Sequence, residues 1–388
     1  SFKIFGNNWN SYLIHSSIFN VIVTISSYLI FRMLQINIYF IVILSISVAF
    51  LAYPVSGTPF LDLHSTFFTL LAVYSIIFGI IKERDISWFY ASIFLCLAFF
   101  SKQVPASYTI IGLGLVNIYL AINKKKLNIF FYFIFGAILI LLFIFLLLIV
   151  NEIEFKNFIL QFFLFPTSIG ADRYGLYELG FKNIILDYKF IHIIFFPLLA
   201  INILNFIRSE KYRHSKEFQI FLILLVFTVS TLFHQIFTKN QIYIFFLIPI
   251  LTGFLLYYNK FIQIKFNKKY FTYLIIGLCI FTTTKYHLRF NKERKFHELN
   301  KVVISNSIKA NTIDNKFSEL NWISPHFKDP QEEVDLIKSF LSLLEKEKEN
   351  VMLITQYNFF SSLLNKKLFS PSRTYDSISY PRKNTKYF

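Results

Sequence analysis

Long apolar stretches separated by short polar segments run along most of the chain. Ten of them approach the roughly 20 residues that an α-helix needs to cross a bilayer. They cover residues 12–34, 37–53, 62–81, 86–101, 104–122, 128–150, 188–207, 218–237, 241–258 and 270–286. Because a backbone in lipid must satisfy its own hydrogen bonds, each stretch is expected to be helical. The pattern predicts an all-α polytopic membrane protein with about ten transmembrane helices.

Two segments depart from this pattern. Residues 151–187 carry enough polar side chains to form a loop outside the membrane, and 152–165 within it predict an amphipathic helix lying in the interface. Residues 287–388 are polar and mixed, which predicts a separate tail. We therefore expect a transmembrane domain over 1–286, with 151–187 as its large outer loop, and a small C-terminal α/β extracytoplasmic domain over 287–388.

Local signals in the tail favour a mixture of helix and strand. Asp329 before Pro330 has the order of a helix N-cap followed by the first helical residue. Residues 351–355, Val-Met-Leu-Ile-Thr, predict a short buried strand, and residues 359–364 predict a second helix. The tail is thus expected to bury a small core of its own.

Composition and charge agree with a membrane protein. Of the 388 residues, 55% are hydrophobic and 16% are charged, whereas soluble domains carry about 25% charged residues. The net charge of +17 would suggest nucleic acid in a soluble protein. Here the basic residues gather in alternate loops, near 82–84, 124–126, 208–216 and 260–269. The positive-inside rule then places these loops in the cytoplasm and the tail outside it, with membrane lipid and no nucleic acid as the expected partner.

Two clusters of polar residues lie where predicted outer loops meet helices. Asp62 and His64 open a helix after a turn rich in Pro, and Lys102 with Gln103 lies between two outer helix ends. Polar and ionisable groups at membrane depth are costly, so they mark candidate sites. Plain structural explanations also stand, because an acid in a first helical turn complements the helix dipole and a Lys can cap a helix C-terminus.

Two further groups lie on the same predicted side of the membrane. The short hairpin between two predicted helices, over residues 234–243, holds several hydrogen-bonding side chains, namely His234, Gln235, Lys239, Gln241 and Tyr243. The outer loop contributes Arg173, whose guanidinium suits a phosphate. Each group can also be a solvated polar loop without a function. Together they predict an outward-facing site for an anionic lipid that carries a polar group.

Other chemistries lack support in the sequence. The chain contains no GxxxxGK[ST], GxSxG, HExxH or CxxC pattern, so ATP-driven, serine-hydrolase, zinc-protease and thioredoxin-like functions are not indicated. The two cysteines, Cys96 and Cys279, lie inside apolar stretches and are interpreted as small hydrophobic residues. We predict no cofactor and no metal ligand, and leave dependence on a divalent metal open.

Three local runs, taken in order, resemble the multi-spanning glycosyltransferases of the GT-C fold, which include protein mannosyltransferases and the aminoarabinose transferases of lipid A. The first opens a helix after an outer turn, the second ends a helix in a Lys at the outer face, and the third begins a late helix. They are residues 62–72, 98–103 and 240–249. The resemblance covers about 12–258, with the tail as a looser match.

The resemblance implies a sugar transferase that uses a polyprenyl-phosphate carrier as donor and a glycan, lipid or protein as acceptor. It places the site at the extracytoplasmic face, such as the periplasmic face of a bacterial inner membrane. It also implies a carboxylate as general base and cations that stabilise the departing phosphate. In the family the principal Asp lies in the first outer loop, but residues 1–11 contain no acid. We therefore expect that base upstream of an N-terminally truncated chain, with Asp62 as a provisional catalytic residue and Lys102 as a phosphate contact.

The sequence is also compatible with other functions. A transporter or flippase for a lipid-linked glycan would need broken helices and charge pairs in mid-helix, and the sequence shows few. A surface-polysaccharide polymerase or ligase would suit the large loop 151–187 but not the tail. A structural or sensory protein would place its function in 287–388.

Overall fold

The structure is a computed structural model of the chain. It describes the residues grouped as 9–52, 60–124, 126–164, 166–167, 180–238, 244–262, 267–289, 303–324, 326–347, 351–353, 355, 357, 359–366 and 368. These residues are mostly helical, as predicted. They divide into two compact units, His15–Leu147 with Leu179–His297, and Ser1–Ile14 with Leu148–Glu178 and Glu298–Phe388.

Each of the ten apolar stretches contains an α-helix. The helices are α2 (Trp9–Met33), α3 (Ile38–Ala52), α4 (Leu61–Lys82), α5 (Ser87–Ser101), α6 (Gln103–Lys124), α7 (Asn128–Val150), α10 (Lys189–Arg208), α12 (Lys216–Thr238), α13 (Leu247–Tyr258) and α14 (Lys268–Leu288). Within the described residues, six of them, α2, α4, α6, α7, α10 and α12, are long and apolar enough to cross a membrane. The sequence therefore identified the helices well, and an integral membrane protein is indicated.

The helix α13 begins later than predicted. The apolar stretch starts at residue 241, but α13 starts at Leu247, and residues 244–246 before it are not α-helical. Pro249 therefore lies in the first turn of α13, where a missing backbone N–H costs nothing because that group has no partner inside the helix. Proline here helps to start the helix instead of bending it.

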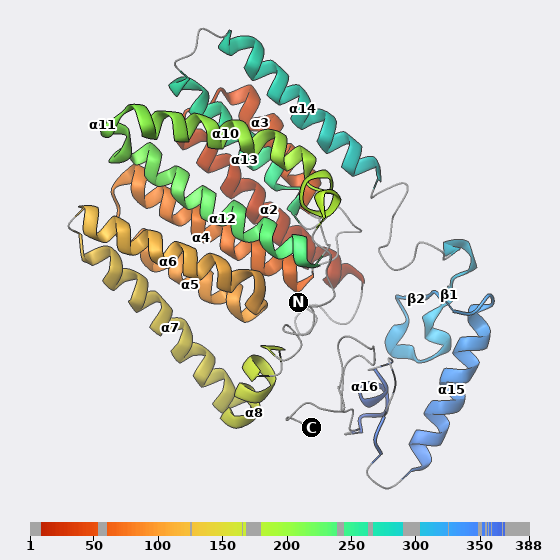
Figure 1. The fold of residues 1–388 in the computed structure, drawn as a ribbon. Helices are drawn as coiled ribbons and strands as arrows, with labels where there is room; N and C mark the ends of the chain where they lie inside the picture. The colour runs from red at the N-terminus through yellow and green to blue at the C-terminus, as the bar shows by residue number, and fades with distance from the viewer. Residues whose placement is uncertain are drawn as a thin grey trace. The chain divides into compact units, whose positions relative to one another are not determined.

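The helix α4 lies at the centre of the larger unit. It packs against α5, α6 and α12, and these four helices lie side by side in Figure 1. Phe67, Leu70 and Ile77 along α4 are completely buried. A Cβ atom added at Gly79 would lie 2.5 Å from Cζ3 of Trp88, which shows how closely α4 and α5 approach.

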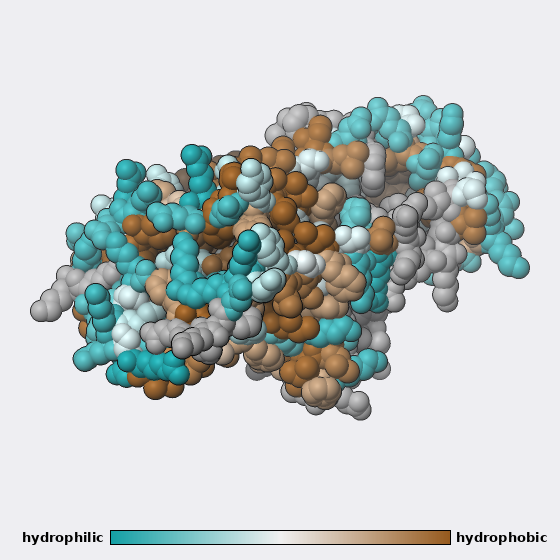
Figure 2. Space-filling view, turned by 90° about the horizontal axis from the view of Figure 1, so that it is seen from above, coloured by the Kyte–Doolittle hydropathy of each residue, from teal (hydrophilic) through white to brown (hydrophobic). Residues whose placement is uncertain are grey.

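A second group of helices, α3, α10, α13 and α14, completes this unit. The helix α7 also belongs to the unit and is mostly exposed. The helix α13 packs against α3 and α10, and α3 also packs against α14. Only 11% of the apolar window of α7 is buried, and it contains Ile, Leu and Phe side chains almost throughout. Figure 2 shows broad areas of hydrophobic side chains on the outside of the molecule. Such a surface is expected where helices face lipid instead of water.

The first part of the loop 151–187 is helical, as predicted. It forms α8 (Phe155–Ile159), followed by a π-helical turn, η1 (Leu160–Leu164). Neither element contains a buried residue, although both are rich in Phe. An apolar, unburied helix of this kind fits an interfacial location.

The tail contains a small two-stranded sheet and two helices. Strand β1 (Ile308–Lys309) pairs antiparallel with β2 (Asn321–Trp322), with Ile308 opposite Trp322. Helix α15 (Pro330–Lys346) starts as predicted, since Oδ1 of Asp329 accepts a hydrogen bond from the backbone N–H of Gln331 at 2.9 Å. Helix α16 (Phe360–Leu364) matches the second predicted helix.

Among the residues that the structure describes, the strand predicted at 351–355 is reduced to a single β-bridge residue, Met352. Val351, Leu353 and Thr355 take no part in the two-stranded sheet, which is formed by β1 and β2. Leu353 is nevertheless buried with Val334 and Phe360 in the core of the tail. The apolar run thus indicated burial correctly, but burial alone does not distinguish a strand from an irregular segment.

Candidate functional site

Asp62, Lys102 and His234 come from three different helices. Asp62 lies in the first turn of α4, Lys102 is the residue that ends α5, and His234 lies in the last turns of α12. Both plain structural roles considered for Asp62 and Lys102 are therefore present: the acid lies at a helix N-terminus, and Lys102 follows the C-terminus of a helix. The same placements bring all three side chains to one end of the α4, α5 and α12 group.

The three side chains meet at a single carboxylate oxygen. Nζ of Lys102 lies 2.5 Å from Oδ1 of Asp62, and Nε2 of His234 lies 3.2 Å from the same atom. The side chains of Lys102, Asp62 and His234 are 32%, 13% and 4% exposed, respectively. The group thus runs from a buried His to a partly exposed Lys. Oδ2 of Asp62 accepts no hydrogen bond from any described residue.

Hydroxyl groups on α4 connect this cluster to the backbone. Oγ of Ser65 donates a hydrogen bond to the carbonyl of Lys102 at 3.1 Å, which ties α4 to the junction between α5 and α6. Oγ1 of Thr66 donates to the carbonyl of Asp62 at 2.7 Å. Because both partners of the Asp62–Lys102 pair are held through their backbones, the ion pair has a defined geometry.

His64 lies next to a second histidine that the sequence analysis did not single out. Nε2 of His64 and Nε2 of His15 are 2.7 Å apart, and Nδ1 of His64 lies 2.9 Å from the carbonyl oxygen of Phe60. A carbonyl oxygen only accepts, so Nδ1 of His64 carries the proton, and in a neutral pair His15 donates to Nε2 of His64. The rings of Phe19 and His64 pack edge-to-face, with their centroids 4.4 Å apart. The available signal for His15 was a lone His in the first apolar stretch.

Gln235 is fully buried beside His234 on α12. Its Oε1 accepts a hydrogen bond from Oγ1 of Thr238 at 3.1 Å, while its Nε2 has no partner among the described residues. Gln103 is half-buried at the start of α6, and its carbonyl accepts a hydrogen bond from Oγ of Ser107 at 2.6 Å. The amide nitrogen of Gln235, with its two N–H donors, is therefore unused among the described residues, one residue along α12 from His234.

The structure does not place every predicted site residue. Arg173, Lys239, Gln241 and Tyr243 lie outside the described residues. Of the predicted residues that are described, Lys102 and His234 each contact Asp62 directly. The described residues contain no group of three or more His, Cys, Asp and Glu side chains that could hold a metal ion.

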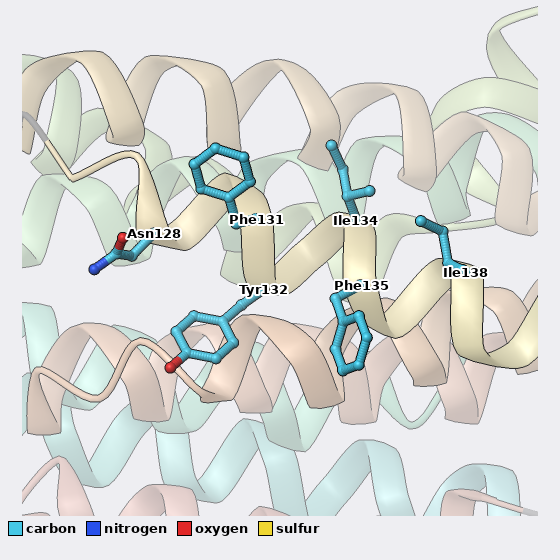
Figure 3. A pocket seen from close by; sticks show the side chains of 6 residues that line it. All are labelled: Asn128, Phe131, Tyr132, Ile134, Phe135 and Ile138. Atoms are coloured by element: carbon cyan, nitrogen blue, oxygen red, sulfur yellow. The ribbon is translucent and has the colours of Figure 1, made fainter.

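An apolar hollow lies along α7 and is not a candidate for the chemistry. It has a volume of about 540 Å³, and the residues that line it, from Asn128 to Ile138, all belong to α7. Figure 3 shows Phe131 and Ile134 on one side of the helix and Tyr132 and Phe135 on the other. The lining contains no acid, base or cation at neutral pH, so it suits an acyl chain better than a reacting group.

The fold and the cluster together define a helical membrane protein with one carboxylate bound by a Lys and a His at the ends of three helices. No protein-family model matches the chain, and no curated protein or solved structure matches it.

Proposed function

We propose that this chain is a membrane glycosyltransferase of the GT-C type that takes a sugar from a polyprenyl-phosphate carrier. In this proposal α3, α5, α13 and α14 cross the membrane together with the six long apolar helices. The tail and the Asp62 end of α4 then face the extracytoplasmic side, which in a bacterium is the periplasmic side of the inner membrane. The acceptor is a glycan, a lipid or a protein.

The observation that supports the proposal is the meeting of Asp62, Lys102 and His234. Charged groups in a membrane-embedded bundle are expensive and face the interior or a polar cavity, where they serve binding or transfer. Lys102 lies 40 residues and His234 lies 172 residues after Asp62 in the sequence, yet both contact the same carboxylate oxygen of Asp62. A site at the end of the bundle is also where a lipid phosphate group lies.

Lys102 is the proposed contact for the donor phosphate. It is the most exposed of the three side chains, and its flexible stem carries a point charge that can move from Asp62 to an incoming phosphate. His234 is nearly buried, so it holds Asp62 in place when Lys102 turns toward the donor. Gln235, with its unused amide donor, is the proposed contact for a sugar hydroxyl.

Asp62 is the carboxylate that the described part of the site offers as general base. The hydroxyl oxygen of the acceptor forms a bond to the anomeric carbon of the sugar, and the proton of that hydroxyl passes to the carboxylate of Asp62. The bond between that carbon and the phosphate oxygen breaks, and the electron pair leaves with the polyprenyl phosphate, where Lys102 stabilises the negative charge. The displacement inverts the configuration of the anomeric carbon.

The test is a transfer assay on the purified protein in liposomes. The donor is a radiolabelled polyprenyl-phosphate hexose or pentose, and cell-envelope extract supplies acceptors. Asp62→Asn and Lys102→Gln are expected to reduce transfer by about 10²-fold or more, which is the lower range for loss of a general base. The matched control is Lys189→Gln, because Lys189 is an exposed Lys at the start of α10 that lies over the ring of Phe190 and forms no ion pair with a described carboxylate.

The assay also separates transfer from transport. Movement of the intact lipid-linked sugar across the bilayer, without cleavage of the sugar–phosphate bond, would identify a flippase and contradict the proposal. Equal transfer by the wild type, Asp62→Asn and Lys102→Gln would remove both residues from the site. Labelling of introduced cysteines tests the orientation, and reagent outside the cell should reach positions 170 and 300 but not positions 125 and 212.

A further inference from the structure

A polar cavity lies at the end of α4 that is opposite to Asp62. It has a volume of about 480 Å³ and is lined by residues from α4, α5, α6, α7 and α12, including Gly79, Trp88, Asn123 and Gln219. Between Asp62 and Glu83, at the two ends of α4, the helix rises about 30 Å at 1.5 Å per residue. The cavity is therefore a separate site and not an extension of the Asp62 cluster.

The charges around the cavity are balanced. Nζ of Lys216 lies 2.6 Å from Oε1 of Glu83, and Nζ of Lys126 lies 3.3 Å from Oδ1 of Asp85. All four residues line the cavity. An anionic ligand would meet two carboxylates here and a cationic ligand two ammonium groups, so neither sign of charge is favoured.

One lining side chain has an unmet hydrogen-bonding capacity. Gln219 is only 2% exposed, and its Oε1 accepts no hydrogen bond from any described residue. A buried polar atom without a partner is costly, and such an atom at a cavity is commonly satisfied by a ligand or water. Because a carboxamide has one acceptor and two N–H donors, Gln219 pairs well with a group that both donates and accepts.

The remaining lining residues set the size and shape of a ligand. About 480 Å³ lies within the 300–1,000 Å³ range of small-molecule sites. Trp88 is 1% exposed and is fixed by a hydrogen bond from its Nε1 to Oδ1 of Asn117 at 2.9 Å, which gives the cavity a rigid aromatic wall. Asn123 adds an exposed amide on the opposite helix, α6.

We propose that this cavity binds a neutral, hydroxyl-rich ligand, which is the chemistry of a sugar or another polyol. Hydroxyl groups donate to Gln219 and to the carboxylates and accept from the lysines. The cavity lies at the ends of helices that cross the membrane, so the polyol comes either from a soluble sugar or from the headgroup of a glycolipid. The proposal does not depend on the transferase function, because it uses none of the residues at the Asp62 end.

The experiment measures saturable binding of two neutral probes to the full-length protein in phosphatidylcholine nanodiscs. One probe is tritiated glucose in solution, and the other is a tritiated glucosyl diacylglycerol within the disc. Phosphatidylglycerol serves as an anionic comparison. Binding of the lipid probe alone assigns a glycolipid headgroup, and binding of both assigns the sugar itself.

Gln219→Leu is the central variant and is expected to weaken binding at least tenfold. Thr228→Val is its matched control, because Oγ1 of Thr228 is a fully buried atom on the same helix that also lacks a described partner, yet Thr228 does not line the cavity. Asn123→Ala, at an exposed position of the cavity wall, provides a second variant that should also weaken binding if Gln219→Leu fails to fold.

Three results would overturn the proposal. Neither neutral probe binds saturably; or the protein retains phosphatidylglycerol in preference to both neutral probes; or the variants at Gln219 and Asn123 bind as the wild type does. Loss of binding in Gln219→Leu with unchanged binding in Thr228→Val supports it. Loss of sugar transfer in the Asp62 and Lys102 variants is a separate measurement, so either proposal can fail alone.

Discussion

The ion pair between Asp62 and Lys102 should couple the stabilities of α4 and α5. Two unit charges 4 Å apart attract by about 4 kcal/mol at an effective dielectric constant of 20. The pair is closer than this, at 2.5 Å between Nζ and Oδ1, but Lys102 is 32% exposed and water screens part of the attraction. Fully exposed pairs contribute about 0–1 kcal/mol, whereas removing one partner of a buried pair costs about 3–5 kcal/mol. We expect a coupling energy of about 1–3 kcal/mol.

A double-mutant cycle measures this coupling. The wild type, Asp62→Asn, Lys102→Gln and the double variant are unfolded in a detergent micelle, and the free energies of unfolding are compared. The matched control is the pair of Lys216 and Glu83 in the same unit, whose side chains are 46% and 65% exposed. That pair should couple by no more than about 0.5 kcal/mol.

The result also depends on His234. Since His234 is only 4% exposed and contacts the same oxygen, Asp62→Asn should cost more than Lys102→Gln, because it removes the partner of two residues and not one. Equal couplings for the Asp62–Lys102 pair and the exposed control pair would refute the view that burial strengthens this contact. A larger loss in Lys102→Gln than in Asp62→Asn would refute the assignment of Asp62 as the centre of the cluster.

Two further predictions concern packing and pH. Gly79→Ala should lower the free energy of unfolding by about 1–3 kcal/mol, because the added Cβ would lie 2.5 Å from Cζ3 of Trp88. Gly114→Ala is the control and should not destabilise the protein, because its added Cβ would meet nothing within 4 Å. Thermal unfolding of both variants measures the difference. In the tail, burial raises the pKa of Glu333. Hydrogen bonds, the largest of them from Tyr357, lower this pKa by more than burial raises it, so the net pKa lies below 4.5. A lowered pKa stabilises the folded tail above pH 4.5 and loses that contribution as the pH falls through the folded-state pKa. The protection factors of the α15 amides, which are exchange rates normalised to the intrinsic rate at each pH, should therefore fall at acid pH in the wild type and change less in Glu333→Gln; an equal fall in both would contradict the assignment.

The tail core shows why these hydrogen bonds outweigh burial. Oε1 of Glu333 accepts from the hydroxyl of Tyr357, and Oε2 accepts from Nε1 of Trp322 at 3.0 Å. The pKa of Tyr357 is raised to about 12, first because burial disfavours the phenolate and second because the neutral hydroxyl donates a hydrogen bond to the carboxylate of Glu333. Trp322 lies in β2 and Glu333 in α15, so the carboxylate joins the sheet to the helix.

Sequence reasoning worked best where the structure is set locally. The helices α2 to α7 and α10, α12 and α14 begin and end within a few residues of the predicted stretches. The cap at Asp329 was also correct, because N-cap chemistry involves neighbouring residues alone. Of the strand predicted at 351–355, the described residues keep only a β-bridge at Met352, because a short apolar run is compatible with any buried conformation and a longer strand also needs a partner elsewhere in the chain.

For the candidate site, the sequence indicated which residues to consider and on which side of the membrane to expect them. It did not indicate which of these side chains contact one another. It did not single out His15, whose role depends on a ring 49 residues away in sequence. It also gave no sign that Gln219 lines a cavity with an unpaired oxygen, because hydrogen-bond satisfaction is a property of the packed state.

What the amino-acid sequence determined by itself is the set of apolar helices and their lipid-compatible lengths, since hydrophobicity and hydrogen bonding within one helix require no distant partner. Only the tertiary structure decided that Asp62, Lys102 and His234 share one oxygen atom, because this contact depends on how α4, α5 and α12 pack together. Packing depends on shape along entire helix faces, as at Gly79 and Trp88, and no short motif encodes it.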